Sequence, residues 1–242
     1  MEKSDERLLV ISGFAGVIGG ILAFVARAVF FFFLPQDVSS YVEVLEIVVD
    51  NADAFLLVVI INFLAIPFYV TLIVGLYKSL RITTLGLLGT VFLIVGTAIN
   101  AVVVSTSRNL LTVATQYAQF SDSADRAVLL VVFRAMDSQA GDVFAVAILS
   151  LMIGFILIGG AMWESGAYHK GFAFLSVIFG ILILVNTIIF PFASVVGPPF
   201  TLLVNGIFDA LLPAAWAIIL GLKLYSLRKA KPLETMDSGT PN

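Results

Sequence analysis

Long apolar runs constrain this chain more than any other feature of its sequence. The first run, Leu8 to Leu34, contains a single charged residue, Arg27. At a rise of about 1.5 Å per residue, a helix of this length measures about 40 Å, enough to cross a hydrocarbon core of about 30 Å with some tilt. Five similar runs follow. The predicted membrane spans are 8–34, 54–77, 83–104, 143–162, 171–195 and 201–225.

These runs predict an all-α membrane protein with six transmembrane helices. Inside hydrocarbon each backbone amide needs a hydrogen-bond partner within the protein, so continuous spans of this length must be helical. The chain is 60% hydrophobic and only 12% charged, which excludes a water-soluble globular fold. We therefore expect residues 1–242 to form a single multi-pass domain in the cytoplasmic membrane, with the lipid bilayer as its main partner.

The lysines and arginines predict the orientation of the spans. If the chain changes sides at every span, nine of the 13 basic residues fall on one side and only Arg108, Arg126 and Arg134 on the other. Loops rich in Lys and Arg stay on the cytoplasmic side, so both termini are predicted to be cytoplasmic. The C-terminal segment 232–242 is polar and rich in helix breakers, and we expect it to be disordered.

Two outer loops are predicted to contain short amphipathic helices. In segment 40–53, Ser40 precedes Glu43 by three residues, the spacing of a capping box at a helix start. Four acidic residues then recur at helical spacing, which indicates a short acidic helix on the outer surface. Its acidic face is either a solvated surface or a site for a cation or partner. These residues are Glu43, Glu46, Asp50 and Asp53.

Segment 105–142 is the longer of the two outer segments. Ser121 to Ser123 provide turn and cap chemistry, and the apolar stretch Ala127–Phe133 that follows is too short to span a membrane. We expect a helical hairpin that either caps the outer mouth of the bundle or lies at the interface. The third span either ends at Val104 or continues into this hairpin on a face formed by Leu110, Val113, Tyr117 and Phe120.

Six polar residues inside the spans lie in the outer half of the membrane. Counted from the outer ends of their helices, four of them lie about 12–14 Å below the surface, and the other two, Asn100 and Asn205, lie nearer to it. An isolated charge is costly there, so we expect Arg27 to pair with Asp209, and the neighbouring asparagines to line an outward-facing pocket for a small molecule. Alternatively, the asparagines join helices and Arg27 reaches toward the headgroups. The predicted site comprises Arg27, Asn62, Asn100, Asn186, Asn205 and Asp209.

Two further patterns concern helix packing. Gly16 and Gly20 form a GxxxG pair, which allows close contact with another helix of the chain or with a second copy in a homo-oligomer. The sequence NFLAIPF at Asn62 is similar to NTIIFPF at Asn186, as expected for an inverted repeat. Asn62 lies eight residues into its span and Asn186 fifteen residues into its own, however, and this offset of about two helical turns argues against that repeat.

Few residues suit a cofactor or a catalytic centre. The chain has no cysteine and one histidine, and Asp209 is the only acid within a predicted span. No phosphate-binding loop or nucleophile elbow occurs. We therefore expect no metal, no cofactor and no enzymatic activity. The net charge of -3 and the scattered basic residues also argue against nucleic-acid binding.

Three stretches resemble an uncharacterised family of six-span bacterial and archaeal membrane proteins. They are GFAGVIGG at Gly13–Gly20, LYKSLR at Leu76–Arg81 and GGAMWESGAYHKGFAFLSVIFG at Gly159–Gly180. The resemblance implies a six-helix fold and assigns no activity or functional residue.

Two functional hypotheses follow. The first is a non-enzymatic accessory protein that binds a small molecule, a lipid or another membrane subunit through the outward-facing polar pocket. The second is a small-solute transporter or channel in which the Arg27 and Asp209 layer selects the solute.

Overall fold

The computed structural model describes residues 3–33, 40–80, 83–196 and 211–227, and of residues 3, 33 and 186–196 it describes the backbone only. The described part contains helices and no strand, which confirms the predicted all-α class. The helices are α1 (Lys3–Phe33), α2 (Tyr41–Asp50), α3 (Ala52–Ser79), α4 (Thr84–Gln119), α5 (Ser123–Ser165), α6 (Lys170–Val196) and α8 (Leu212–Leu227).

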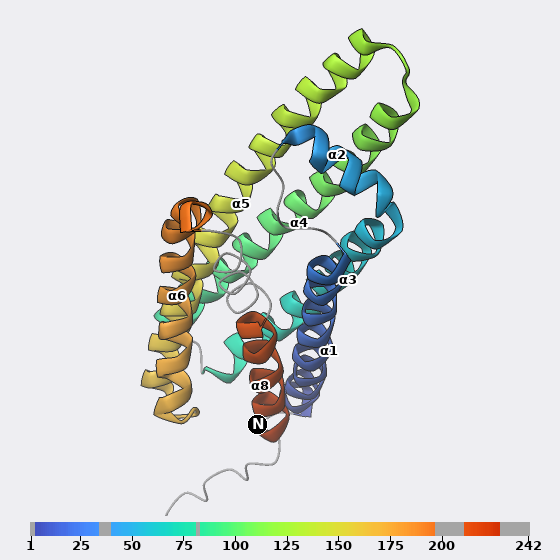
Figure 1. The fold of residues 1–242 in the computed structure, drawn as a ribbon. Helices are drawn as coiled ribbons and strands as arrows, with labels where there is room; N and C mark the ends of the chain where they lie inside the picture. The colour runs from blue at the N-terminus through green and yellow to red at the C-terminus, as the bar shows by residue number, and fades with distance from the viewer. Residues whose placement is uncertain (1–2, 34–39, 81–82, 197–210, 228–242) are drawn as a thin grey trace, which may run out of the picture.

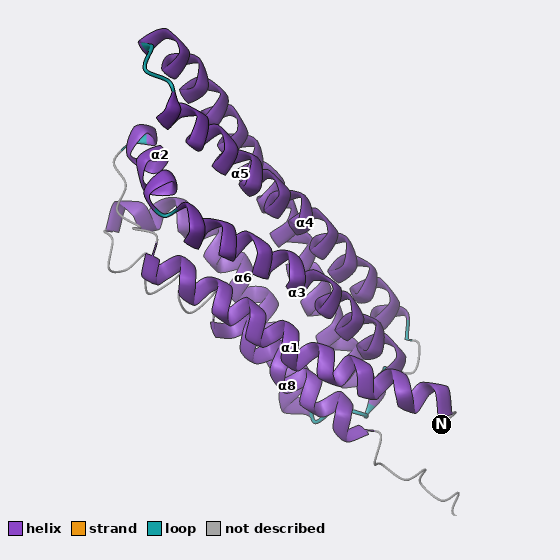
Figure 2. Ribbon diagram, turned by 90° about the vertical axis from the view of Figure 1, so that its right-hand side faces the viewer, coloured by secondary structure: helices purple, strands orange, loops and turns teal. Residues whose placement is uncertain are grey.

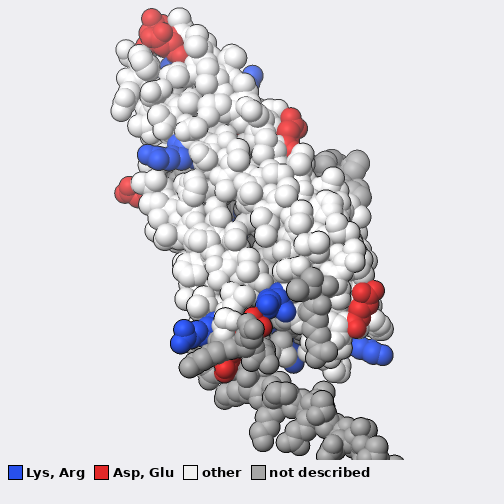
Figure 3. Space-filling view, turned by 180° about the vertical axis from the view of Figure 1, so that it is seen from behind, with Lys and Arg blue, Asp and Glu red and all other residues white. Residues whose placement is uncertain are grey.

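Four helices, α1, α3, α4 and α5, are long and apolar enough to cross a membrane. Two more are apolar over shorter stretches, Lys170–Val185 in α6 and Leu212–Leu227, which is α8. Figure 3 shows charged side chains toward the two ends of the visible face and a broad uncharged band between them. These are the features of a membrane protein. The start of the predicted sixth span and the predicted disordered segment 232–242 lie outside the described residues.

The long helices form two groups of three (Figure 1). In the first group α1 packs against both α3 and α8, and in the second α5 packs against both α4 and α6. The packing of α3 against α4 joins the groups. The first group thus combines helices from the two ends of the chain, and a space between the groups is bounded by all six long helices.

Small residues allow α1 and α8 to touch along their backbones. A Cβ atom on Gly16 would lie 2.8 Å from the carbonyl oxygen of Ala217, and one on Gly20 would lie 2.7 Å from that of Ala214. Such distances leave no room for any side chain larger than hydrogen. Within this chain, α8 is therefore the partner of the GxxxG pair. A homo-oligomer stays a prediction.

The expected outer helix is present as α2. The Glu43 backbone N–H donates a hydrogen bond of 3.3 Å to the Ser40 hydroxyl, which confirms the predicted cap. Leu45 and Val48 of α2 are buried in a cluster with Phe133 of α5. Together α2 and the projecting ends of α4 and α5 form one end of the molecule, here called the hairpin end (Figure 2).

Segment 105–142 forms the expected helical hairpin, and of the two alternatives for the third span the structure shows the continuation, because α4 runs from its span to Gln119. The expectation of a separate second short helix is wrong, since α5 begins at Ser123 and runs without a break to Ser165. Residues 105–119 contain no glycine or proline to end α4. Gly141 in α5 costs only about 1 kcal/mol relative to alanine, too little to end a helix that packs along its length. The predicted turn lies at the expected place, because Asp122 caps α5 by accepting from the Ala124 N–H at 2.8 Å.

The opposite end of the bundle, here called the N-terminal end, is closed by polar contacts. Lys78 of α3 forms an ion pair of 3.1 Å with Asp5 of α1. The hydroxyl groups of Ser79 and Tyr168 hydrogen-bond, which joins α3 to the turn between α5 and α6. Burial raises the pKa of the Tyr168 phenol further above neutral pH. The N-terminal end thus has polar links both within the first helix group and between the two groups.

The α1–α8 contact predicts a specific sensitivity to side-chain size. Gly16→Ala should lower the free energy of unfolding by about 1–3 kcal/mol, because the new methyl group overlaps the backbone of α8. Reversible unfolding in mixed detergent micelles, followed by circular dichroism, measures this change. Gly141→Ala is the matched control, because a Cβ there meets no atom within 4 Å. Equal effects of the two substitutions would contradict the close contact.

Candidate binding cavity between the two helix groups

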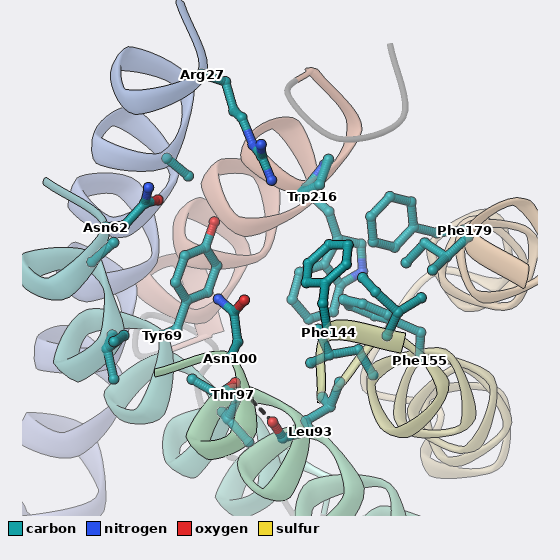
Figure 4. Close-up of a pocket in the computed structure, with 18 of the residues that line it drawn as sticks. Arg27, Asn62, Tyr69, Leu93, Thr97, Asn100, Phe144, Phe155, Phe179 and Trp216 are labelled. Atoms are coloured by element: carbon teal, nitrogen blue, oxygen red, sulfur yellow. Dashed lines mark hydrogen bonds between the residues drawn. The ribbon is translucent and has the colours of Figure 1, made fainter. Parts of the chain in front are cut away.

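A cavity of about 500 Å³ lies between the two groups of helices. Each of the six long helices contributes to its wall, so residues far apart in the sequence face the same space (Figure 4). The described lining residues are Ala23, Arg27, Asn62, Ala65, Ile66, Tyr69, Ile73, Leu93, Thr97, Asn100, Gly141, Phe144, Ala145, Ile148, Leu151, Phe155, Phe179, Ile183, Pro213 and Trp216.

One side of the cavity carries the polar groups. Arg27 from α1, Asn62 and Tyr69 from α3, and Asn100 from α4 extend toward a common space in Figure 4. Asn62 is the first lining residue along α3, which runs from the hairpin end, and Asn100 is the last along α4, which runs back toward that end. The polar groups therefore lie toward the hairpin end of the cavity.

The opposite side is aromatic. The Trp216 ring of α8 lies edge-on to Phe155 of α5, with ring centroids 4.6 Å apart, and is stacked with Phe179 of α6 at 6.4 Å. The Trp216 indole N–H donates a hydrogen bond of 3.1 Å to the buried hydroxyl of Ser176. That hydroxyl donates in turn to the Phe172 carbonyl oxygen at 3.2 Å. These bonds fix the indole and satisfy its polar atom, so an apolar surface faces the cavity.

Arg27 gives the described cavity wall a positive charge. Its side chain is partly buried, and within the described residues no carboxylate lines the cavity or pairs with Arg27. No described residue hydrogen-bonds to the side-chain amides of Asn62 or Asn100, whereas the Thr97 hydroxyl already donates to the Leu93 carbonyl oxygen at 2.7 Å. A guanidinium and two amide groups are therefore available to a ligand.

Three of the six predicted site residues meet at this cavity. Arg27, Asn62 and Asn100 all line it, as the predicted similar depth of Arg27 and Asn62 and the place of Asn100 in the same outer half suggest. Asn186 lies in α6, where the side chains are not described, and Asn205 and Asp209 lie outside the described residues. The ion pair of Arg27 with Asp209 and the binding of a ligand therefore stay predictions.

The aromatic wall and Tyr69 were not identified from the sequence. A Trp or Phe within an apolar run adds only to hydrophobicity, and sequence periodicity does not show which neighbour it meets. Tyr69 gave a weak signal, because its hydroxyl lies in mid-span, where a polar atom needs a partner or a cavity.

Comparisons with known proteins do not assign a family. No protein-family model, no curated protein and no solved structure matches this chain. The resemblance to an uncharacterised six-span family stays an expectation from the sequence. Function is therefore argued from the cavity itself.

The hydrogen bond between Trp216 and Ser176 can be tested by fluorescence. The chain has two tryptophans, so in a Trp163→Phe background Trp216 is the sole reporter. Ser176→Ala should lower the anisotropy of Trp216 and reduce the free energy of unfolding by about 1–3 kcal/mol, because it leaves a buried N–H without an acceptor. Ser150→Ala is the control, since the Ser150 hydroxyl bonds only within its own helix, to Val146 at 3.0 Å. If Ser176→Ala leaves both the Trp216 anisotropy and the free energy of unfolding unchanged, the hydrogen bond does not position the indole.

Proposed function

We propose that this protein is a non-enzymatic membrane protein that binds a small molecule or lipid in the cavity between its two helix groups. The observation that carries the proposal is the meeting of Arg27, Asn62 and Asn100 on one wall of that cavity. A buried arginine is costly in a membrane, and a polar ligand offsets that cost. The cavity volume of about 500 Å³ lies within the usual range of sites for small molecules.

The described wall offers groups that serve binding. It contains one guanidinium, two carboxamides, a phenol and a broad aromatic and aliphatic surface. Hydrogen-bond donors at one side fix the orientation of a ligand, and the apolar surface provides most of its burial. This division of the wall supports a binding protein rather than a catalyst.

The proposal includes six membrane spans and cytoplasmic termini in the cytoplasmic membrane. The distribution of basic residues supports this orientation. The hairpin end then lies outside the cell, so the polar side of the cavity faces outward. As an accessory protein it would also present α2 and the hairpin to another membrane subunit.

A second candidate is a transporter, favoured by the way the helices pack. The contacts of α1 with α3 and α8 are matched by those of α5 with α6 and α4, whereas the packing of α3 against α4 has no equal between the described parts of α6 and α8. In this correspondence each helix runs opposite to its counterpart, which is the plan of an inverted-topology repeat around a central site. The correspondence is inferred from helix contacts and directions. It therefore does not rest on the NFLAIPF and NTIIFPF motifs, which occupy different positions in their spans. Flux of a solute into liposomes, lost on Asp209→Asn, would support this candidate.

Native mass spectrometry of protein extracted gently from its own membrane tests the binding proposal. The wild-type chain should carry a bound small molecule or lipid. Gly141→Phe should lose most of it, because Gly141 lines the cavity where an added side chain meets open space.

Val146→Phe is the matched control for this experiment. Val146 lies on the same helix, is 53% exposed and does not line the cavity, so its substitution should leave the bound mass unchanged. Equal occupancy in the wild-type chain and in Gly141→Phe, or a wild-type chain with no bound mass, would contradict the proposal.

A further inference from the structure

We infer that the cavity takes an amphiphile with one hydrocarbon chain and an oxyanion headgroup, a carboxylate or a phosphate. The inference rests on the proposed binding function and names the chemical class of its ligand. It follows from three features of the wall: where its charge lies, which of its polar groups are available, and what covers the rest of its surface.

The headgroup class follows from the donors at the polar side. Arg27 provides a charged, planar set of N–H groups, the geometry that suits carboxylate and phosphate oxygens. Asn62 and Asn100 flank the same space with amide N–H groups. Since the described wall adds no carboxylate, an anion meets attraction there and a cation meets repulsion.

The hydrocarbon part follows from the opposite wall. Trp216, Phe155 and Phe179 form a continuous aromatic surface. The indole N–H of Trp216 is already bonded to Ser176, so this surface has no donor to offer a polar solute. A sugar or an amino acid would give up its hydrogen bonds to water there without gaining new ones, whereas a hydrocarbon chain has no hydrogen bond to lose.

The arrangement of the two walls gives the orientation. In Figure 4 Arg27 points into the space that separates Tyr69 and Asn100 from the aromatic residues. The polar groups lie toward the hairpin end, and apolar residues such as Ile73 and Leu93 lie nearer the N-terminal end. The headgroup therefore binds toward the hairpin end, with its chain running inward past Trp216.

Quenching of Trp216 tests this ligand class directly. In the Trp163→Phe background, 9,10-dibromostearate should quench Trp216 saturably, because its bromine atoms would lie beside the indole. The uncharged 9,10-dibromostearyl alcohol has the same chain and should bind at least about ten-fold more weakly, since it lacks the charge-assisted hydrogen bonds to Arg27.

Variants of Arg27 show whether its charge, rather than the fold of the cavity, causes the preference for an anion. Arg27→Gln should weaken stearate binding about ten-fold or more and leave alcohol binding unchanged, whereas Arg27→Lys should retain most of the preference for the anion. Arg108→Gln is the matched control, because Arg108 is exposed on α4 and does not line the cavity. Equal binding of acid and alcohol, unaffected by Arg27→Gln, would overturn the oxyanion assignment.

Gly141→Phe distinguishes failure of the oxyanion inference from failure of the proposed function. If the acid and the alcohol bind the parent chain equally and Gly141→Phe abolishes quenching by both, the cavity is a binding site but its ligand is not an anion. If quenching is absent or is unaffected by Gly141→Phe, the amphiphile inference fails, and native mass spectrometry alone decides the proposed function. Competition by palmitate and by hexadecyl phosphate then distinguishes a carboxylate from a phosphate headgroup.

Discussion

The close contact between α1 and α8 is the interaction on which the rest of the structure depends. In a bilayer, lipid tails are as apolar as leucine, so helices associate through close packing rather than through a hydrophobic force. Gly16, Gly20 and Gly221 provide that packing, with backbone atoms of one helix against those of the other. The contact joins the first and last described helices of the chain. It thereby brings Arg27 and Trp216, from the two ends of the described chain, to the wall of one cavity.

The two groups of helices are linked at the N-terminal end, beyond the cavity. There the Ser79 hydroxyl of α3 hydrogen-bonds to the Tyr168 hydroxyl in the turn between α5 and α6, and the ion pair of Asp5 with Lys78 holds α1 to α3 within the first group. Toward the hairpin end, polar side chains from α1, α3 and α4 face the aromatic wall from α5, α6 and α8 across open space. A separation of polar and apolar walls is what an amphiphile requires, because each part of it then meets a matching surface.

Much of the fold, and half of the candidate site, could be predicted from the sequence. Hydropathy located the apolar cores of the helices, and the Ser40 cap identified α2. Depth counted along each helix placed Arg27 and Asn62 at one level and Asn100 in the same outer half, because the membrane gives all spans a common reference plane. The aromatic wall could not be found in this way, since hydropathy does not show which faces meet. The unbroken α5 was also missed, because tertiary packing outweighs the small cost of Gly141.

An electron cryo-microscopy structure of the protein in nanodiscs made with its native lipids would show directly whether an amphiphile occupies the cavity. We expect an elongated ligand density between the two helix groups, with the headgroup on the Arg27 guanidinium and the hydrocarbon chain along Trp216. Helix groups in direct contact, with side chains filling the space and Arg27 directed away from it, would contradict the existence of a binding cavity.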